Sequence, residues 1–550
     1  MTAPHNPDNR SAPWKALLFT HLVALLILGY ILVRDTQPVP MYDLHLTQGE
    51  RLKCVSYAPF HRPGQSPFDP LETIPRDQIA ADLAALAKIT ECVRIYSVDQ
   101  GLEQVPELAR AVGLKVLLGA WIGGDPKRNM VQLDRAIALA NEHADVVRVL
   151  IVGNEVLLRR ERSEDEMREL IEYAKARVNV PVTYADVWEF WLKHRSLAAS
   201  VDRVTVHILP FWEDNPVAIE GALKHVAEVF EEVSHVFDKP LMIGETGWPS
   251  AGRQREESLP SLVNQARYIR EFVHQAHAKG WDYNLIEAID QPWKRKLEGT
   301  VGGYWGMLDT DLQPKFPLAG PVSERSGLQT PLVAASIGAL ICLLVAASAK
   351  ASALRLVVAA ITGAVAGIVA VLHREHAQFA YRDAFEMIAL GGVFAAGIVL
   401  PMLIARWNPG TPLPSLEKAW QDLRKRPSSR CESATLLGML RGILLFAAAV
   451  AALLLFVDPR YRDFPVLLYL VPALSFSALG WTSEGRHGIE ERVCALVIAI
   501  TVIGRWLTEP ANPQAIAWLL TGLLLALPYL GTRALAITSS ESSSPTAAKL

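Results

Sequence analysis

The sequence predicts an α/β protein in two parts, a (β/α)₈ TIM barrel and an all-α polytopic transmembrane domain. Short β-rich runs alternate with amphipathic helical stretches through the middle of the chain. One apolar run of membrane-spanning length precedes this region, and several more follow it. We expect residues 1–34 to form a cytoplasmic tail and N-terminal transmembrane anchor, 35–320 the barrel, and 321–550 a domain of about seven transmembrane helices.

The barrel prediction rests on eight strand-like runs. They cover residues 52–59, 92–97, 115–122, 146–155, 181–186, 204–212, 240–248 and 283–291. Helical patterns at the 3.6-residue period separate them, and such alternation implies a parallel sheet. Eight units in roughly 270 residues match the length of a TIM barrel. The alternative is an open doubly wound sheet, but no glycine-rich phosphate turn follows the first run.

The apolar run at residues 14–33 is about 20 residues long, enough to cross a bilayer. A cleaved signal peptide is the competing interpretation, but residues 34–38 lack a small-residue cleavage motif, which favours an uncleaved anchor. A GxxxG motif at residues 363–367 is typical of packed membrane helices. The later apolar runs lie near residues 331–348, 353–372, 384–404, 436–457, 464–479, 493–507 and 515–530.

The distribution of basic residues predicts the orientation of these helices. If the N-terminus is cytoplasmic, the cations of the inner loops are Lys350, Arg355, Lys418, Arg424, Lys425, Arg426, Arg430, Arg486 and Arg492. The outer loop at residues 508–514 has none, although other outer loops carry Arg374, Arg382, Arg460 and Arg462. We therefore expect a multi-pass inner (plasma) membrane protein in contact with the lipid bilayer, with its barrel on the periplasmic or extracytoplasmic side.

Charge and cysteine content exclude several classes of function. The formal net charge of -3 gives no basic face for nucleic acid. The five cysteines form neither a zinc pattern nor a CxxC pair. Cys54 and Cys92 fall on the first two predicted strands, where the geometry of neighbouring parallel strands favours buried free thiols over a disulfide. No cluster of histidine and aspartate suggests a metal, and we expect neither a metal nor a cofactor.

Two glutamates stand at the predicted carboxyl ends of strands four and seven. The fourth run ends Gly153-Asn154-Glu155, and the seventh contains Gly244-Glu245. The carboxyl ends of TIM-barrel strands form the active site, so these side chains can face each other across the mouth. Retaining glycosidases need two carboxyl groups about 5–5.5 Å apart. At that distance each raises the proton affinity of the other, so that one can stay protonated near neutral pH.

These motifs resemble those of glycoside hydrolase family 17, the β-1,3-glucanase family. The resemblance begins with Gly153-Asn154-Glu155 and with the Ile-Gly-Glu-Thr-Gly-Trp-Pro-Ser stretch at residues 243–250. The stretches at 55–59, 94–96, 287–294 and 302–306 are similar to the bacterial, membrane-anchored branch of β-1,3-glucanases and glucanosyltransferases. The resemblance covers the middle domain, about half of the chain.

The resemblance implies roles for individual residues. Glu155 would be the acid/base and Glu245 the nucleophile. Asn154 would hydrogen-bond the sugar 2-hydroxyl, and Tyr96 would orient the nucleophile. Further residues expected to bind substrate, the tryptophans by stacking on apolar sugar faces, are Tyr57, Arg94, Trp212, Trp248, Trp293 and Trp305.

Three further polar residues have open interpretations. Glu287 and Asp290, near the end of strand eight, either hold a substrate hydroxyl or form an ion pair with Lys294 or Arg94. We interpret His207 on strand six as a satisfied histidine of the inner barrel rather than as a catalyst. Strand six also departs from the tyrosine-rich stretch of the plant enzymes.

A covalent glycosyl-enzyme can be resolved by water or by another sugar hydroxyl, so the two glutamates serve hydrolysis and transglycosylation alike. We expect a retaining glycoside hydrolase or transglycosylase that remodels periplasmic or exported β-1,3-glucan, with a separate membrane glucan synthase as a candidate partner. One alternative is a plain endo- or exo-β-1,3-glucan hydrolase. Another is an accessory export or scaffold subunit of that synthase. The inner loop at 406–433 is too short to hold a nucleotide-sugar domain.

Overall fold

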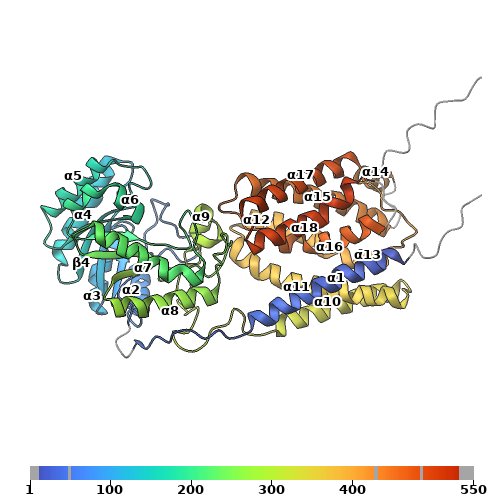
Figure 1. Cartoon of the computed structure of the whole chain (residues 1–550), viewed down its shortest axis with the longest axis horizontal. Helices are drawn as coiled ribbons and strands as arrows, with labels where there is room; N and C mark the ends of the chain where they lie inside the picture. The colour runs from blue at the N-terminus through green and yellow to red at the C-terminus, as the bar shows by residue number, and fades with distance from the viewer. Residues whose placement is uncertain (1–10, 47–50, 426–431, 483–486, 532–550) are drawn as a thin grey trace, which may run out of the picture. The chain divides into compact units, whose positions relative to one another are not determined.

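The computed structural model describes residues 11–46, 51–425, 432–482 and 487–531 (Figure 1). The chain divides into two compact units. One runs from Pro38 to Glu324, and the other combines the N-terminal segment up to Gln37 with the chain from Arg325 onward. The N-terminal helix therefore belongs to the same unit as the C-terminal helices.

The first unit is the predicted (β/α)₈ barrel. Eight parallel strands close in chain order, with β1 beside β8. The strands are β1 (Val55–Ser56), β2 (Cys92–Ile95), β3 (Lys115–Ala120), β4 (Val147–Asn154), β5 (Val182–Val187), β6 (Val204–His207), β7 (Leu241–Thr246) and β8 (Asp282–Leu285). Valine, isoleucine and leucine dominate them because a parallel sheet is buried on both faces.

Helices cover the outside of the barrel. They are α2 (Arg76–Leu86), α3 (Val105–Ala111), α4 (Pro126–Glu142), α5 (Glu164–Lys175), α6 (Trp188–Lys193), α7 (Ile219–Val236) and α8 (Leu262–Lys279), with 3₁₀ turns at Leu102–Gln104 and Arg195–Ala199. The 3₁₀ turn Pro292–Lys294 and α9 (Arg295–Gly302) follow β8 at the carboxyl end of the barrel. Local sequence sets their ends. A capping box of Ser163 and Glu166 begins α5, and Gly280, in the left-handed conformation, ends α8.

The interior of the barrel changes character along the strand direction. An apolar layer lies inside it, made of Cys54, Cys92, Leu117, Val149, Ile151, Ala185 and Met242. On the first two strands the buried side chain two residues further along is polar: Ser56 follows Cys54, and Arg94 follows Cys92. Because side chains on a strand alternate with a period of two, this polar layer also points inward, toward the carboxyl-end mouth.

The prediction of free thiols at Cys54 and Cys92 is wrong, because the two residues form a disulfide. The register that pairs Val55 with Val93 places them side by side. Both face the barrel interior, where their Cα atoms approach to 4.3 Å. The bridge can form because both side chains point in the same direction, into the barrel. The expectation of free thiols considered only that the strands are parallel neighbours.

This disulfide gives a prediction for the purified protein. Under denaturing alkylation without reductant, Cys342 should be modified while Cys54 and Cys92 stay protected until a reductant is added. Loss of the bridge through Cys54→Ser should destabilise the barrel by up to about 4 kcal/mol in a chain-entropy model, since 38 residues separate the partners. Peptide mass spectrometry and thermal melting check the two parts. Alkylated Cys54 in the unreduced protein would contradict the assignment.

The second unit is helical throughout its described residues apart from connecting turns. Its helices are α1 (Ala12–Asp35), α10 (Gln329–Ser348), α11 (Ala353–Ala380), α12 (Ala384–Ile398), α13 (Leu400–Arg406), α14 (Leu416–Lys425), α15 (Ser433–Val457), α16 (Val466–Thr482), α17 (Ile489–Thr508) and α18 (Pro513–Leu530). Each of the seven predicted apolar runs after residue 321 is helical.

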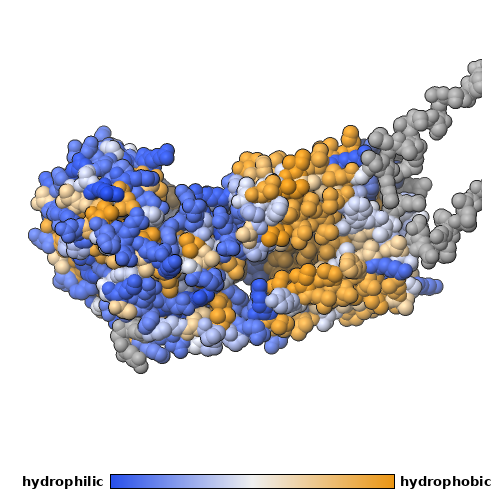
Figure 2. Space-filling view, in the orientation of Figure 1, coloured by the Kyte–Doolittle hydropathy of each residue, from blue (hydrophilic) through white to orange (hydrophobic). Residues whose placement is uncertain are grey.

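Six segments of this unit are long and apolar enough to cross a membrane: α1, α10, α11, the α12–α13 segment, α15 and α18. The apolar helix α16 is shorter, with 17 residues. Apolar residues cover much of the visible surface of the unit in Figure 2. Large apolar side chains of this unit are widely exposed; Phe385, Phe446 and Leu507 are 78%, 62% and 63% exposed. Lipid tails are the solvent that such a surface matches.

The predicted glycine motif brings two of these helices together. A Cβ added at Gly363 would lie 2.2 Å from the carbonyl oxygen of Gly338, and one at Gly367 would lie 2.0 Å from that of Ala334. Only glycine therefore lets α10 and α11 approach this closely. Of the predicted inner-loop cations, Arg426, Arg430 and Arg486 lie outside the described residues.

Candidate active site

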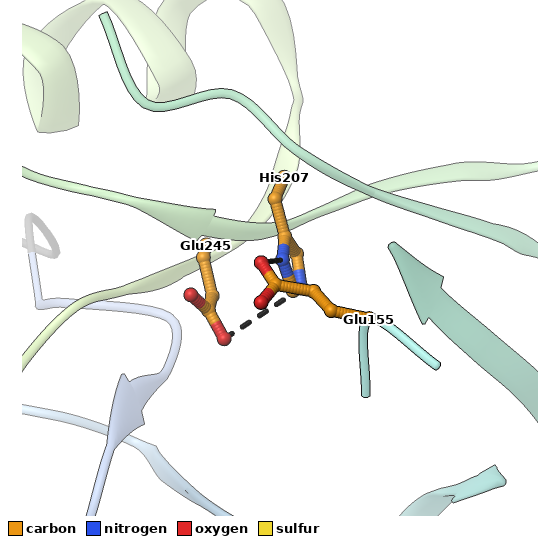
Figure 3. Close-up of side chains that lie close together, drawn as sticks. All are labelled: Glu155, His207 and Glu245. Carbon is orange, nitrogen blue, oxygen red and sulfur yellow. Dashed lines mark hydrogen bonds and ion pairs between the residues drawn. The ribbon is translucent and has the colours of Figure 1, made fainter. Parts of the chain in front are cut away.

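Glu155 and Glu245 meet at the carboxyl-end mouth of the barrel. Glu245 lies in β7, and Glu155 directly follows β4. A carboxylate oxygen of one lies within 4.8 Å of a carboxylate oxygen of the other. Figure 3 shows the two side chains converging, with His207 of β6 between them. This separation is close to the spacing of a retaining glycosidase and too short for the water that an inverting enzyme places between its carboxyl groups.

The end of β4 has an unusual backbone that directs Glu155. Gly153 has φ 84°, and a Cβ there would meet Val156 Cγ2 at 2.7 Å. Glu155 itself has φ 52°, in the left-handed region that costs a non-glycine residue about 1–3 kcal/mol. The register between β4 and β5 shifts at the same place. The Gly-Asn-Glu sequence thus encodes a bulge that aims the glutamate into the mouth.

Glu245 is held by two donors from β2 and its extension. The Tyr96 hydroxyl donates to Glu245 Oε1 at 2.8 Å, and Arg94 Nη1 lies 3.3 Å from the same oxygen. Arg94 also donates to the Gly244 carbonyl at 2.7 Å and, through Nη2, to Asn154 Oδ1 at 2.5 Å. Burial, and after it the negative charge of Glu245, raise the pKa of Tyr96 well above its ordinary value, so the hydroxyl stays a donor.

His207 contacts both glutamates. Its Nδ1 lies 2.9 Å from Glu155 Oε1 and its Nε2 lies 3.6 Å from Glu245 Oε1, and the side chain is fully buried. Burial alone would raise the pKa of Glu155, but the hydrogen bond and charge of His207, with the charges of Arg159 and Arg94, outweigh it. The pKa of Glu155 is therefore lowered, whereas the sequence led us to expect a pair in which one carboxyl stays protonated.

Glu155, His207 and Glu245 are also side-chain types that bind metals, and their ligand atoms lie close together. Glu155, however, contacts Nδ1 of His207, and Glu245 lies near Nε2 of the same ring. A single cation could bind only one of these two nitrogens. Arg94 Nη1 lies 3.4 Å from His207 Nε2, so the guanidinium charge would repel a metal cation bound between His207 and Glu245. The arrangement fits a proton-handling network better than a metal site.

The position of His207 gives a second prediction. A Cβ added at Gly244 would lie 2.6 Å from Thr205 Cγ2 and 3.0 Å from His207 Cδ2. Gly244→Ala should therefore displace the imidazole and lower kcat by about tenfold or more, with an overpacking cost of about 1–3 kcal/mol. Gly124→Ala is the matched control, since nothing lies within 4 Å of its Cβ position and its φ is not in the left-handed region. Unchanged kcat in Gly244→Ala would contradict a positioning role for His207.

Glu287 and Asp290, left open by the sequence, both form ion pairs. Lys294 Nζ lies 2.9 Å from Glu287 Oε2, and Lys315 Nζ lies 2.8 Å from Asp290 Oδ1. Burial raises the pKa of Glu287 to about 7 and that of Asp290 to about 6, against the lowering effect of the lysines. Asp290 also accepts a hydrogen bond from the Gly306 amide, so it anchors the loop that follows β8.

The expected tryptophans differ in exposure. Trp212 and Trp293 are partly exposed, whereas Trp305 is 5% exposed and packs edge-on against Trp212. Trp248 is fully buried, and its Nε1 donates to the Leu259 carbonyl. Its ring packs against Phe211 and so cannot face a sugar.

Tyr57 also lies away from the mouth. The ring is 1% exposed, and its hydroxyl donates to Asp82 Oδ2 at 2.8 Å within the layer between strands and helices. Strand alternation gives the reason: Ser56 faces inward, where it contacts the Tyr96 hydroxyl, so Tyr57 faces outward. Tyr57 and Trp248 are thus the two expected substrate-binding residues that the structure does not bring to the site.

Three polar residues join the site without having been assigned to it from the sequence. His207 was interpreted as a satisfied core histidine. Asn284 of β8 donates to the Gly244 carbonyl and to Ser56, each at 2.8 Å. The pKa of Glu298 in α9 is raised, mainly by burial and further by the negative charges of Glu155 and Glu245. Inward alternation along β6 and β8 is the signal that could have indicated His207 and Asn284.

Comparisons with known proteins agree with this geometry. Residues 54–306 match the family model described as the BtgE/BtgC glycoside hydrolase domain. The probable beta-glucosidase btgE of Aspergillus flavus is 27% identical over 242 residues, 42% of this chain and 39% of that protein. A glucan 1,3-beta-glucosidase of Arthroderma benhamiae is 28% identical over 238 residues, 40% of this chain and 75% of that protein.

A solved structure also matches this part of the chain. The glycoside hydrolase family 17 beta-1,3-glucanosyltransferase from Rhizomucor miehei is 23% identical, with a TM-score of 0.43, over 49% of this chain and 98% of that one. The chain spans about two fifths of the length of the Aspergillus relative. The family model thus matches residues 54–306, a little under half of this chain, in agreement with the resemblance of the sequence to a glycoside hydrolase family.

Proposed function

We propose that this protein is a retaining glycoside hydrolase or transglycosylase that acts on β-1,3-glucan through a covalent glycosyl-enzyme on Glu245. The observation that carries the proposal is the approach of Glu155 and Glu245 to within 4.8 Å at the mouth of a closed barrel. The name of the Arthroderma relative, a glucan 1,3-beta-glucosidase, supports the choice of linkage.

The geometry suggests how each step would run. Glu245 attacks the anomeric carbon while Glu155 gives its proton to the departing glycosidic oxygen. Glu155, now a carboxylate, then takes a proton from water or from a sugar hydroxyl, whose oxygen displaces Glu245 from the same carbon. Tyr96 and Arg94 hold the attacking carboxylate. Asn154, which accepts a hydrogen bond from Arg94, precedes the acid/base Glu155 and would hydrogen-bond the 2-hydroxyl of the sugar.

The first step requires a proton on Glu155, whereas His207 and the neighbouring cations lower its pKa. A bound glucan that excludes water from the two glutamates would raise the pKa of one of them, because desolvation and like charge both disfavour two carboxylates. His207 Nδ1, 2.9 Å from Glu155 Oε1, is the nearest group that can supply or hold this proton. Proton loading would thus be coupled to substrate binding.

We further propose that the barrel lies on the extracytoplasmic side of a membrane crossed by the helical unit. The Cys54–Cys92 disulfide supports this placement because disulfides persist in oxidising compartments such as the periplasm. Among the described residues, Lys15, Lys350 and Arg406, at one end of the helices, form no ion pair. An excess of lysine and arginine marks the cytoplasmic end of membrane helices.

The arginines at the opposite helix ends are mostly compensated. Five of them form ion pairs: Arg34–Asp35, Arg325–Glu375, Arg382–Glu386, Arg462–Asp458 and Arg505–Glu509. Of the four outer-loop arginines that weaken the sequence-based orientation, Arg382 and Arg462 are among these pairs. A membrane glucan synthase as partner stays a prediction.

Product analysis tests the activity. Full-length protein in detergent would be incubated with reducing-end-labelled β-1,3-gluco-oligosaccharides, and the products measured by mass spectrometry beside a Glu245→Gln control. Products longer than the substrate, absent from the control, would establish glucanosyl transfer, and only shorter products would establish hydrolysis. Equal inertness of wild type and control on every β-glucan would overturn the proposed substrate.

A further inference from the structure

Phe68, in the loop after β1, is an exposed aromatic residue on a tightly held backbone. Its side chain is 68% exposed. Gln100 Nε2, from the loop after β2, donates to the carbonyls on either side of it, Asp69 at 2.7 Å and Pro67 at 3.4 Å. The Phe68 amide donates to Ser66 Oγ. A large apolar side chain that stays this exposed on a held backbone is available to contact a ligand.

Phe68 meets Trp293 from the loop after β8. The two ring centroids lie 5.6 Å apart at an interplanar angle of 75°. Trp293 is fixed in turn, because its Nε1 donates to Gln291 Oε1 at 2.7 Å and Gln291 Nε2 donates to the Ala58 carbonyl at 2.8 Å. The loops come from neighbouring strands, since β1 pairs with β8. Together the two rings form an edge-to-face shelf at the carboxyl-end rim.

The shelf lies next to the reactive centre but outside it. The loop that carries Trp293 starts beside Glu245, because the Ile286 amide donates to the Thr246 carbonyl at 2.9 Å, and Lys294 in the same loop pairs with Glu287. No hydrogen bond or ion pair among the described residues links Phe68 or Trp293 to Glu155 or Glu245. We expect a ligand that contacts both regions to extend beyond the sugar at the reaction centre.

We propose that Phe68 and Trp293 form an outer glucan subsite that binds the C–H face of a sugar unit distant from the cleaved bond. The inference rests on the proposed function and specifies its substrate as an extended chain rather than a disaccharide. Pyranose rings present flat apolar faces, and rings that are already fixed lose little conformational entropy on stacking against them. Only oligosaccharides long enough to reach the rim gain from this contact.

The test compares chain lengths in the full-length protein in detergent. We would measure kcat/KM for a β-1,3-linked trisaccharide and a heptasaccharide with wild type, Phe68→Ala and Phe68→Tyr. Leu71→Ala is the control, since Leu71 is an 88% exposed apolar residue of the same loop without a ring. Phe68→Ala should lower kcat/KM for the heptasaccharide about tenfold and leave the trisaccharide within about twofold. Phe68→Tyr and Leu71→Ala should match wild type.

The outcomes separate this inference from the function on which it rests. An equal loss on both lengths, or no loss on either, would overturn the subsite while an active wild type upholds the proposed function. A loss in Leu71→Ala equal to that in Phe68→Ala would also overturn it, because general apolar contact would then explain the effect. A wild type that processes neither oligosaccharide would instead refute the proposed function.

Discussion

Replacement of Glu245 by glutamine should reduce turnover of β-1,3-gluco-oligosaccharides by at least about a thousandfold. An amide cannot attack the anomeric carbon, yet it keeps the shape of the carboxylate and can still accept from Tyr96 and Arg94. The fold and substrate affinity should therefore survive while kcat collapses. Initial rates with purified full-length protein, together with the thermal midpoint, give the measurement.

The matched control for this variant is Glu228→Gln, on the outer helix α7, where the glutamate side chain is 61% exposed. That change removes the same charge without touching the mouth and should leave kcat unaltered. A Glu245→Gln enzyme that retains a rate within tenfold of wild type would show that another group is the nucleophile.

Replacement of Glu155 by glutamine should lower the rate on natural glucans by about a hundredfold to ten-thousandfold, the range of general acid–base catalysis. The size of the loss should depend on the leaving group. An aryl glucoside with an acidic phenol needs little protonation, so its first step should survive, and azide, which needs no general base, should then accelerate turnover. Rates with leaving groups of graded acidity, with and without azide, provide the measurement.

The same experiment distinguishes Glu155 from His207 as the proton donor. If His207 gave the proton directly, Glu155→Gln would reduce the rates on all leaving groups equally, and azide would not rescue the enzyme. That pattern would contradict the acid/base assignment of Glu155. It would leave the role of Glu245 intact, since the nucleophile acts on the opposite side of the reacting bond.

Much of the fold and the central pair could be predicted because their signals are local and repeated. Eight alternations of strand and helix determine a barrel, and a barrel brings the carboxyl ends of all its strands together. Two glutamates at such ends, Glu155 and Glu245, therefore had to share one mouth. The apolar runs after residue 321 were readable for the same reason, since helix length and hydropathy need no tertiary information.

Other features depend on which way a side chain points near a strand end. Tyr57 and Trp248 belong to the motifs that resemble the family, but their side chains point away from the barrel interior and are buried in the core between strands and helices. The disulfide of Cys54 with Cys92 depends on the register between β1 and β2. Alternation along β6 could have shown that His207 points inward, but its contact with both glutamates also depends on the register between β6 and β7, which shifts at His207.

Trapping the glycosyl-enzyme tests the central claim most directly. A β-1,3-linked gluco-oligosaccharide donor carrying 2-fluorine and a dinitrophenolate leaving group should form the covalent intermediate faster than water can release it, because fluorine disfavours the oxocarbenium-like state of both steps while the leaving group assists only the first. The account predicts one added glycosyl mass on intact protein, mapped by peptide fragmentation to Glu245. A label on any other residue, or none in an enzyme that turns over glucan, would contradict it.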